Sequence, residues 1–455
     1  MPRGPILGSL LCLCLLSPAQ AVSQSVDTVV ISLEDAERRA LERHPLLEPA
    51  SVEVELAEAQ SHRARRARYL PEFNLRNVWG PIPRQRGEFT ETGVLFSPDS
   101  AKGIGDLRWF TDVQLQLLQP IHTFGKAGNR IDAAEHGVEA SRAGLETTRA
   151  DVLLQVRELY WGLLLGLELR DVARDVLDEV DEAEATLEER YEQGDATQND
   201  LFKFRIFRYE AYRRTREVEA RTREAEGGLR AALGLEEATA VRPADEALEP
   251  EEATLDSLSA YMETALESRP ELARLRAGIA ARRSLAAAEE ADRWPNLFAG
   301  AEVRLNAAPS RFDPDNPFWD DQTNFGRAGV VVGFDWDLNF MHHGDQAEVS
   351  RLEARRLEAQ RAPLEEQVRI QVREAWLKAD RARLDVEEGE EALQASENWL
   401  RAELQTYDLG LGEIEDVISA FRANAEMRTE QLRNVAEFNT ALAELSRRVG
   451  RDVRP

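Results

Sequence analysis

The sequence predicts a mainly α-helical protein with a β-barrel portion, built from long antiparallel coiled-coil helices and four amphipathic strands per chain. Three observations lead to this fold class. The second half of the chain repeats the first, two long stretches have apolar residues at helical spacing, and four segments alternate between apolar and polar residues. Because four strands cannot close into a barrel by themselves, several copies of the chain must share one barrel.

The internal repeat divides the chain into two equivalent halves. A block from Leu33 to Leu47 recurs from Leu258 to Leu272 after a shift of about 225 residues, and later blocks recur after about 216. Each half has the order helix, strand, strand, helix, helix. The predicted organisation is a signal peptide at 1–21, a first repeat at 22–234, a linker at 235–257, a second repeat at 258–450 and a tail at 451–455.

The N-terminus has the features of a secretory signal. Arg3 precedes an apolar run at 6–16, and a small-residue cleavage site ends at Ala21. Cys12 and Cys14 are the two cysteines of the chain and both lie in that run, so the mature protein is expected to have none. Acylation of one of them, as in a lipoprotein, is the less favoured alternative. The formal net charge of −27 disfavours nucleic acid as a partner.

The predicted strands alternate between apolar and polar residues over enough positions to cross a membrane as β-strands. Apolar and polar residues alternate from Asp106 to Leu117 and from Arg327 to Leu338, and more weakly at 72–79 and 296–305. Strands of about 10 residues with one apolar face and aromatic residues near their ends are typical of transmembrane barrels. Trp109 and Trp336 are the aromatic positions expected in such a barrel. The alternative for any one strand is a half-buried sheet packed on a helix.

Helical stretches follow each pair of strands. Residues 129–193 contain no proline and predict about 97 Å of helix, too long for a globular domain. Shorter helices are expected before the strands and after each long helix, and laid end to end they match the long one. Pro363 has no counterpart in the first half and predicts a kink or a local helix start.

The number of chains in the barrel follows from its interior. Two chains would supply eight strands and a lumen filled by side chains, whereas three would supply twelve strands and a water-filled lumen. The wider barrel is favoured by the polar residues that alternate with the apolar ones: Arg108, Asp112, Gln114, Gln116, Asp335 and Asp337.

Nearly the whole mature chain then matches one known pattern. The matching residues are Leu33-Glu34-Asp35-Ala36 through Pro45, Gln119-Pro120-Ile121 with Gly125-Lys126, and the two segments from Tyr191 to Asp200 and from Tyr407 to Asp416. With these motifs and the duplicated order of elements, the chain resembles the TolC-type outer-membrane efflux proteins. The resemblance implies a homotrimer with a twelve-stranded barrel in outer-membrane lipid and an α-helical tunnel that closes like an iris in the periplasm. It also implies a periplasmic adaptor and an inner-membrane pump as partners.

The turns between the long helices and their successors are the predicted tips of this tunnel. Gly194 and Gly410 are expected to end the long helices in left-handed turns, and Tyr191 lies just before the first of them. These tips are the expected docking sites of the adaptor.

An acidic residue follows each tip glycine and is the predicted gate. In a trimer, Asp200 or Asp416 would form a ring of three carboxylates at a constriction, which attracts cations; helix N-capping is the alternative role. The resemblance implies that Tyr407 holds Asp200 in the closed state. Two departures weaken this latch: Gly412 replaces the family's basic latch residue and Ser419 replaces its second acid.

Other functions are disfavoured by the sequence. No phosphate-binding loop, nucleophile elbow or metal-ligand spacing is present, so no enzyme activity, cofactor or metal is predicted. His122, His342 and His343 lie at equivalent strand-to-helix junctions, where polar lining is favoured over metal contact. The remaining competitor is a periplasmic adaptor or coiled-coil scaffold without a pore. The exported substrate is not encoded in a recognisable motif.

Overall fold

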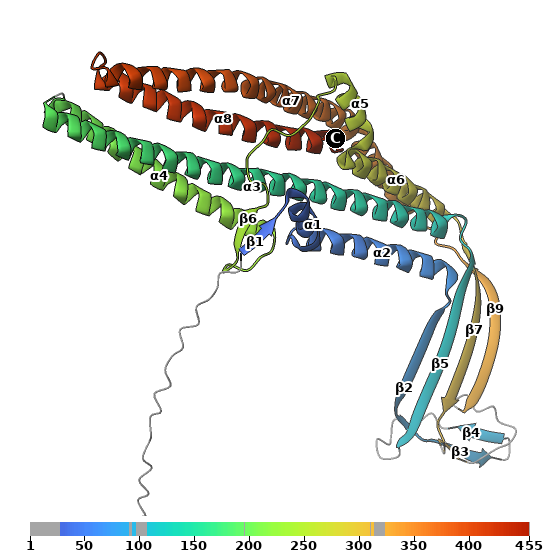
Figure 1. The fold of residues 1–455 in the computed structure, drawn as a ribbon. Helices are drawn as coiled ribbons and strands as arrows, with labels where there is room; N and C mark the ends of the chain where they lie inside the picture. The colour runs from blue at the N-terminus through green and yellow to red at the C-terminus, as the bar shows by residue number, and fades with distance from the viewer. Residues whose placement is uncertain are drawn as a thin grey trace, which may run out of the picture.

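An elongated helical body with a four-stranded sheet at one end makes up the protein (Figure 1). The computed structural model describes residues 28–90, 93–96, 107–194, 196–309, 311–313 and 324–454. The predicted signal peptide, with Cys12 and Cys14, lies outside the described residues. In the described part of the chain, no helix is both long enough and apolar enough to span a membrane.

Both halves of the chain contain the predicted order of helix, strand, strand, helix and helix. The first half consists of α1 (Leu33–Arg43), α2 (Leu47–Tyr69), β2 (Glu72–Pro83), β5 (Leu107–His122), α3 (Lys126–Gln193) and α4 (Gln198–Ala232). The second half consists of α5 (Leu258–Ser268), α6 (Pro270–Glu290), the short 3-10 turn η2 (Ala291–Arg293), β7 (Asn296–Ala307), β9 (Phe325–Asp335), α7 (Phe340–Asp408) and α8 (Ile414–Val449). The mainly helical fold class is confirmed.

Local sequence explains where these helices begin and end. Ser32 caps α1 by accepting a hydrogen bond from the amide of Asp35 at 3.2 Å. The chain breaks before Pro45 and again before Pro270, because proline removes a donor and favours a new helix start. The local start expected at Pro363 is wrong: α7 runs without interruption from Phe340 to Asp408 and includes this proline. Packing of α7 along α6 and α8 holds the helix together there.

The long helices form one curved layer (Figure 1). In the half away from the sheet, α3 packs between α4 and α8, and α8 packs between α3 and α7. In the half nearer the sheet, α3 packs between α2 and α6, and α6 packs between α3 and α7. Each long helix therefore lies beside shorter helices placed end to end, as the length arithmetic predicts. The outer edges of the layer are α2 and α4 on one side and α7 on the other.

The sheet has the order β2-β5-β7-β9 and is antiparallel throughout. Short strands accompany it where the sequence indicates only loops: β3 (Gln85–Thr90), β4 (Gly93–Phe96) and β8 (Phe312–Asp313) pair with one another. The polar composition of these segments favours turns, and β3 pairs with β8 between residues far apart in the chain, which local sequence does not reveal. The pairing of β3 with β4 is a local hairpin that the sequence prediction missed. Another parallel pair, β1 (Thr28–Ile31) with β6 (Ala240–Pro243), brings the linker to the N-terminal segment.

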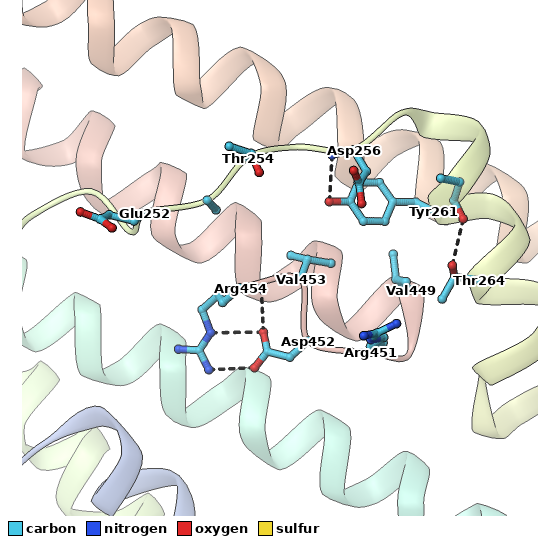
Figure 2. Close-up of a pocket in the computed structure, with 12 residues that line it drawn as sticks. Glu252, Thr254, Asp256, Tyr261, Thr264, Val449, Arg451, Asp452, Val453 and Arg454 are labelled. Carbon is cyan, nitrogen blue, oxygen red and sulfur yellow. Dashed lines mark hydrogen bonds and ion pairs between the residues drawn. The ribbon is translucent and has the colours of Figure 1, made fainter.

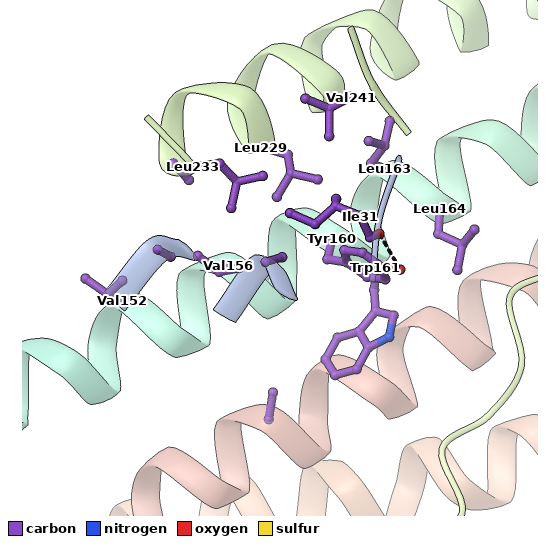
Figure 3. Close-up of a cluster of buried hydrophobic side chains, with 14 of the residues drawn as sticks. Ile31, Val152, Val156, Tyr160, Trp161, Leu163, Leu164, Leu229, Leu233 and Val241 are labelled. Carbon is purple, nitrogen blue, oxygen red and sulfur yellow. Dashed lines mark hydrogen bonds between the residues drawn. The ribbon is translucent and has the colours of Figure 1, made fainter. Parts of the chain in front are cut away.

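The largest buried cluster lies at mid-height, where β1 and β6 cover α3 (Figure 3). Tyr160 is fully buried at its centre. Its hydroxyl donates a hydrogen bond to Asp245 Oδ2 at 2.7 Å and lies 3.3 Å from the carbonyl of Ile31. The linker is thus fastened to the middle of the helical body.

Candidate functional site

The four-stranded sheet has one apolar and one polar face. Residues paired directly across antiparallel strands share a face, and the register aligns Leu75, Leu115, Val303 and Ala328 on one of them. Neighbouring residues of each strand point to the opposite face. The side chains on the apolar face are exposed in the single chain, with Trp79 67 % and Val330 85 % accessible.

The polar face carries a connected set of charges. Arg304 donates two hydrogen bonds to Asp112, at 2.9 and 2.8 Å, between β7 and β5. Arg327 on β9 lies 3.5 Å from Glu302 on β7. A sheet with charged pairs on one face and uncovered apolar side chains on the other is suited to separate water from lipid.

Aromatic side chains gather at both ends of the sheet. Trp109 lies on β5 in the half away from the helices, with its ring 5.9 Å from that of Trp79. Trp336 lies one residue beyond β9, at the helical end, and its indole nitrogen donates to the carbonyl of Arg293 at 3.0 Å. Its ring contacts Phe340 edge-on. The two tryptophans predicted as barrel positions therefore lie at opposite ends of the strands.

The tips of the two helical hairpins lie side by side at the far end of the molecule (Figure 1). Gly194 ends α3 with φ +84° and Gly410 follows α7 with φ +75°, the left-handed conformation that glycine adopts without strain. Tyr191, in the last turn of α3, is 42 % exposed. Apolar side chains from α3, α4, α7 and α8 pack behind the tips, and Phe204 is completely buried among them.

Arg190 connects the tips, and sequence reasoning missed it. Its guanidinium donates to the carbonyl of Tyr407 and to Asp408 Oδ1, both at 3.0 Å, and lies over the Tyr407 ring at 4.8 Å. A second link joins Lys203 on α4 to Glu415 on α8 at 2.6 Å. The only signal in the sequence is an arginine in the last turn of α3, which local rules assign to helix-dipole compensation.

Asp200 and Tyr407 are both near the tip contact but are not hydrogen-bonded to each other in the described chain. The Asp200 carboxylate accepts hydrogen bonds from the amide and hydroxyl of Thr197, and the Thr197 hydroxyl caps α4 in return. Burial raises the pKa of the Tyr407 hydroxyl. The charge of Arg190 opposes this effect, and the charges of Asp200 and Asp408 add to it. Asp200 therefore acts as a capping residue here, and Tyr407 is held by Arg190.

Asp416 lies in the first turn of α8, where its amide donates to the carbonyl of Glu413 at 3.1 Å. The Ser419 hydroxyl donates to the carbonyl of Glu415 within the same helix. Gly412 is packed against the end of α7, because a Cβ there would lie 3.2 Å from the backbone nitrogen of Tyr407. A side chain at position 412 would therefore crowd the backbone at the end of α7.

The junction histidines have separate environments. His343 is buried, with its Nε2 3.1 Å from Asp337 Oδ2, whereas His342 Nε2 lies 3.2 Å from the side-chain nitrogen of Gln346. His122 packs edge-on against Phe124. Among the described residues, no group of three or more His, Cys, Asp or Glu side chains is placed to hold a metal ion.

Charged side chains at mid-height fasten the C-terminal tail to both halves. Arg157 on α3 is 6 % exposed and donates to Glu37 at 2.6 Å and to Asp452 at 2.8 Å. The tail borders a cavity with a volume of about 650 Å³. Arg454 also donates a hydrogen bond to Asp452 there (Figure 2). Burial alone would raise the pKa of Asp452, but hydrogen bonds from Arg454 and the charges of Arg157 and Arg454 hold it well below its usual value.

Comparisons with known proteins agree with this geometry. The family model for outer membrane efflux proteins matches residues 37–235, most of the first repeat. A sequence comparison with curated proteins gives no match.

Solved structures match over most of the chain, at identities that establish the fold alone. A membrane protein from Pseudomonas aeruginosa is 17 % identical with a TM-score of 0.75, over 92 % of this chain and 93 % of the other. The outer membrane channel CmeC from Campylobacter jejuni is 14 % identical with a TM-score of 0.73, over 92 % and 85 %. The outer membrane protein VceC from Vibrio cholerae is 16 % identical with a TM-score of 0.71, over 92 % and 96 %.

The family match covers the first repeat, and the second repeat has the same order of elements in the same fold. The first repeat therefore matches the outer membrane efflux protein family, and most of the chain has the fold of these solved structures.

Proposed function

We propose that three copies of this chain form the exit duct of a tripartite efflux or type I secretion system in the outer membrane. The duct carries small molecules or other exported substrates across the periplasm and outer membrane. The observation that carries this proposal is the two-faced sheet joined to a helical body about 100 Å long. Such a sheet suits a wall between lipid and water, and the helices have the length to cross a periplasmic space.

Three copies are proposed because the sheet is incomplete. Within the described chain, β2 and β9 are edge strands of the four-stranded sheet. Unpaired backbone groups cost several kcal/mol each in lipid, so these edges must pair with other copies. Twelve strands leave room for water beside the charges of Asp112, Glu302 and Arg304 on the polar face. A pore-free periplasmic scaffold would leave both the apolar face and the edges unexplained.

The hairpin tips are the proposed gate and the proposed docking site for a periplasmic adaptor, which would link the duct to an inner-membrane pump. A ring of three Asp416 carboxylates would attract cations at the constriction. Arg190 and Lys203 couple the two tips of one chain, so opening requires these contacts to loosen together. The bond between Tyr407 and Asp200 stays a prediction for a closed state in which Thr197 releases the carboxylate.

Single-channel conductance of the purified protein in a planar bilayer tests the duct and its gate. We expect small, cation-selective conductance that divalent cations block, and Asp416→Asn is expected to weaken both the selectivity and the block. Glu48→Gln is the matched control, because Glu48 also lies in the first turn of a helix but away from the tips. Folded protein that forms no channel would refute the duct, and unchanged selectivity in Asp416→Asn would refute only the gate.

A further inference from the structure

The two edges of the helical layer carry apolar side chains that the chain itself leaves uncovered. Large apolar side chains are exposed on α2, α4 and α7. In the described part of the chain, α6 and α8 expose none, and α3 exposes only Tyr191 in its last turn. The helices that expose large apolar side chains are therefore the edge helices of the layer, because α2, α4 and α7 each have a neighbour on one side only.

On α4 the exposed side chains form one stripe. Phe202, Ile206 and Tyr209 are 51 %, 62 % and 68 % accessible, on the face opposite the residues that pack on α3. Arg213 and Arg216 continue this stripe four and seven residues after Tyr209. Neither arginine makes an ion pair with any residue that the structure describes, unlike their neighbours Arg205 and Arg208.

On α7 the corresponding stripe ends in acidic residues. Leu377 and Leu384 are 53 % and 41 % accessible, on the face opposite the residues that pack on α8. Glu388 and Glu391 follow Leu384 by four and seven residues, and within the described ranges neither has an ion-pair partner. One edge of the layer is thus apolar and basic, and the other is apolar and acidic.

The two stripes have matching heights above the tips. Arg213 and Arg216 lie about 15 and 18 residues, or ~22 to 27 Å of helix, from the tip end of α4. Glu388 and Glu391 lie about 20 and 17 residues, or ~26 to 30 Å, from the tip end of α7. The tips of the two hairpins are level, because Arg190 contacts Asp408. Rotation about an axis along the tunnel preserves height, so basic and acidic stripes of neighbouring copies would meet.

The sheet identifies the occupant as a second copy of this chain. Strand β2 follows α2 at one edge, and β9 leads into α7 at the other. Pairing β2 of one copy with β9 of the next therefore brings the α2 and α4 edge of the first beside α7 of the second. We propose that Arg213 and Arg216 of each copy form ion pairs with Glu388 and Glu391 of its neighbour, next to an apolar seam. This seam rests on the trimeric duct proposed above and fixes which edges of the chains meet.

Charge reversal on each side, followed by their combination, tests the seam. The variants are Arg213→Glu with Arg216→Glu, Glu388→Arg with Glu391→Arg, and all four together. Loss of one exposed ion pair is expected to lower the equilibrium constant for trimer formation about twofold. A trimer would contain six such pairs, so either double variant should lower this constant roughly 60-fold. The quadruple variant is expected to recover most of this loss. Arg213→Glu is also made alone, with Arg214→Glu as its control, because Arg214 is the next residue of the same helix and points away from the stripe.

The readout is the fraction of trimer in detergent as the protein is diluted, measured by light scattering at low and high salt. The wild-type trimer is expected to weaken with salt, because exposed ion pairs are screened. Double variants that dissociate like wild type, or a quadruple variant that adds the two losses, would overturn the seam. A wild-type protein that is monomeric and forms no channel would instead overturn the proposed function, so the two failures are distinguishable.

Discussion

Replacing Tyr160 with phenylalanine removes one hydroxyl from the contact that fastens the linker to the helical body. That hydroxyl donates to Asp245 at 2.7 Å and lies near the carbonyl of Ile31, so it connects β1, α3 and the residues after β6. Burial and the Asp245 carboxylate raise the pKa of Tyr160, so the phenol remains a hydrogen-bond donor at neutral pH. Phenylalanine keeps the buried ring and creates almost no cavity.

The structure sets the size of the effect. A hydrogen bond to a charged group contributes about 1.5–3 kcal/mol, but Asp245 is exposed and can bind water instead. The carbonyl of Ile31 also keeps its hydrogen bond from the amide of Ala244. The expected cost therefore lies at or just below the lower limit of this range, about 1–1.5 kcal/mol of local stability. This corresponds to a roughly 5- to 13-fold larger equilibrium constant for local opening.

Hydrogen exchange measured by mass spectrometry follows this opening. Amides of β1 and β6 should exchange roughly 5- to 13-fold faster in Tyr160→Phe, whereas those in α8 near the tips should not change. Tyr69→Phe is the matched control, because the Tyr69 ring is 65 % exposed and its hydroxyl has no hydrogen bond among the described residues. Equal exchange in wild type and Tyr160→Phe, or equal acceleration in both variants, would refute the anchoring role.

Four further variants test the packing, the tail and the turns. Leu445→Ala removes a fully buried side chain and should cost about 2–5 kcal/mol, seen as a lower temperature for loss of helical circular dichroism. The lowered pKa of Asp452 stabilises the tail above the unfolded-state pKa of about 3.9, so the tail should loosen as the pH falls below that value; relative to the intrinsic exchange rate at each pH, the protection of tail amides should fall less in Asp452→Asn than in wild type. Gly194→Ala should cost about 1 kcal/mol from its φ of +84° alone, whereas Gly450→Ala should cost more, because its Cβ would also lie 3.2 Å from the backbone of Arg269. Comparing the melting temperatures of the two variants checks this order.

Local sequence patterns predicted those parts of the fold whose physical cause lies in residues close together in the chain. Periodicity predicts both long helices, and Ser32 and Gly194 mark helix ends because capping and left-handed turns depend on residues a few positions apart. Alternation predicts all four strands of the sheet, since one face must be apolar and the other polar. At Pro363 the local start is wrong, because packing along two neighbouring helices outweighs the lost hydrogen bond, and the alternative of a kink stays a prediction.

The duplication, the helices, the amphipathic strands and the glycine turns were therefore determined by the sequence itself. Contacts between distant residues were decided only by the tertiary structure: Arg157 meets Glu37 across 120 positions and Asp452 across 295. The same holds for Arg190, which reaches Asp408 across 218 positions and lies over the ring of Tyr407. An arginine has the same local preference whether it faces water or a carboxylate from another helix. Its partner is therefore set by how the layer of helices packs.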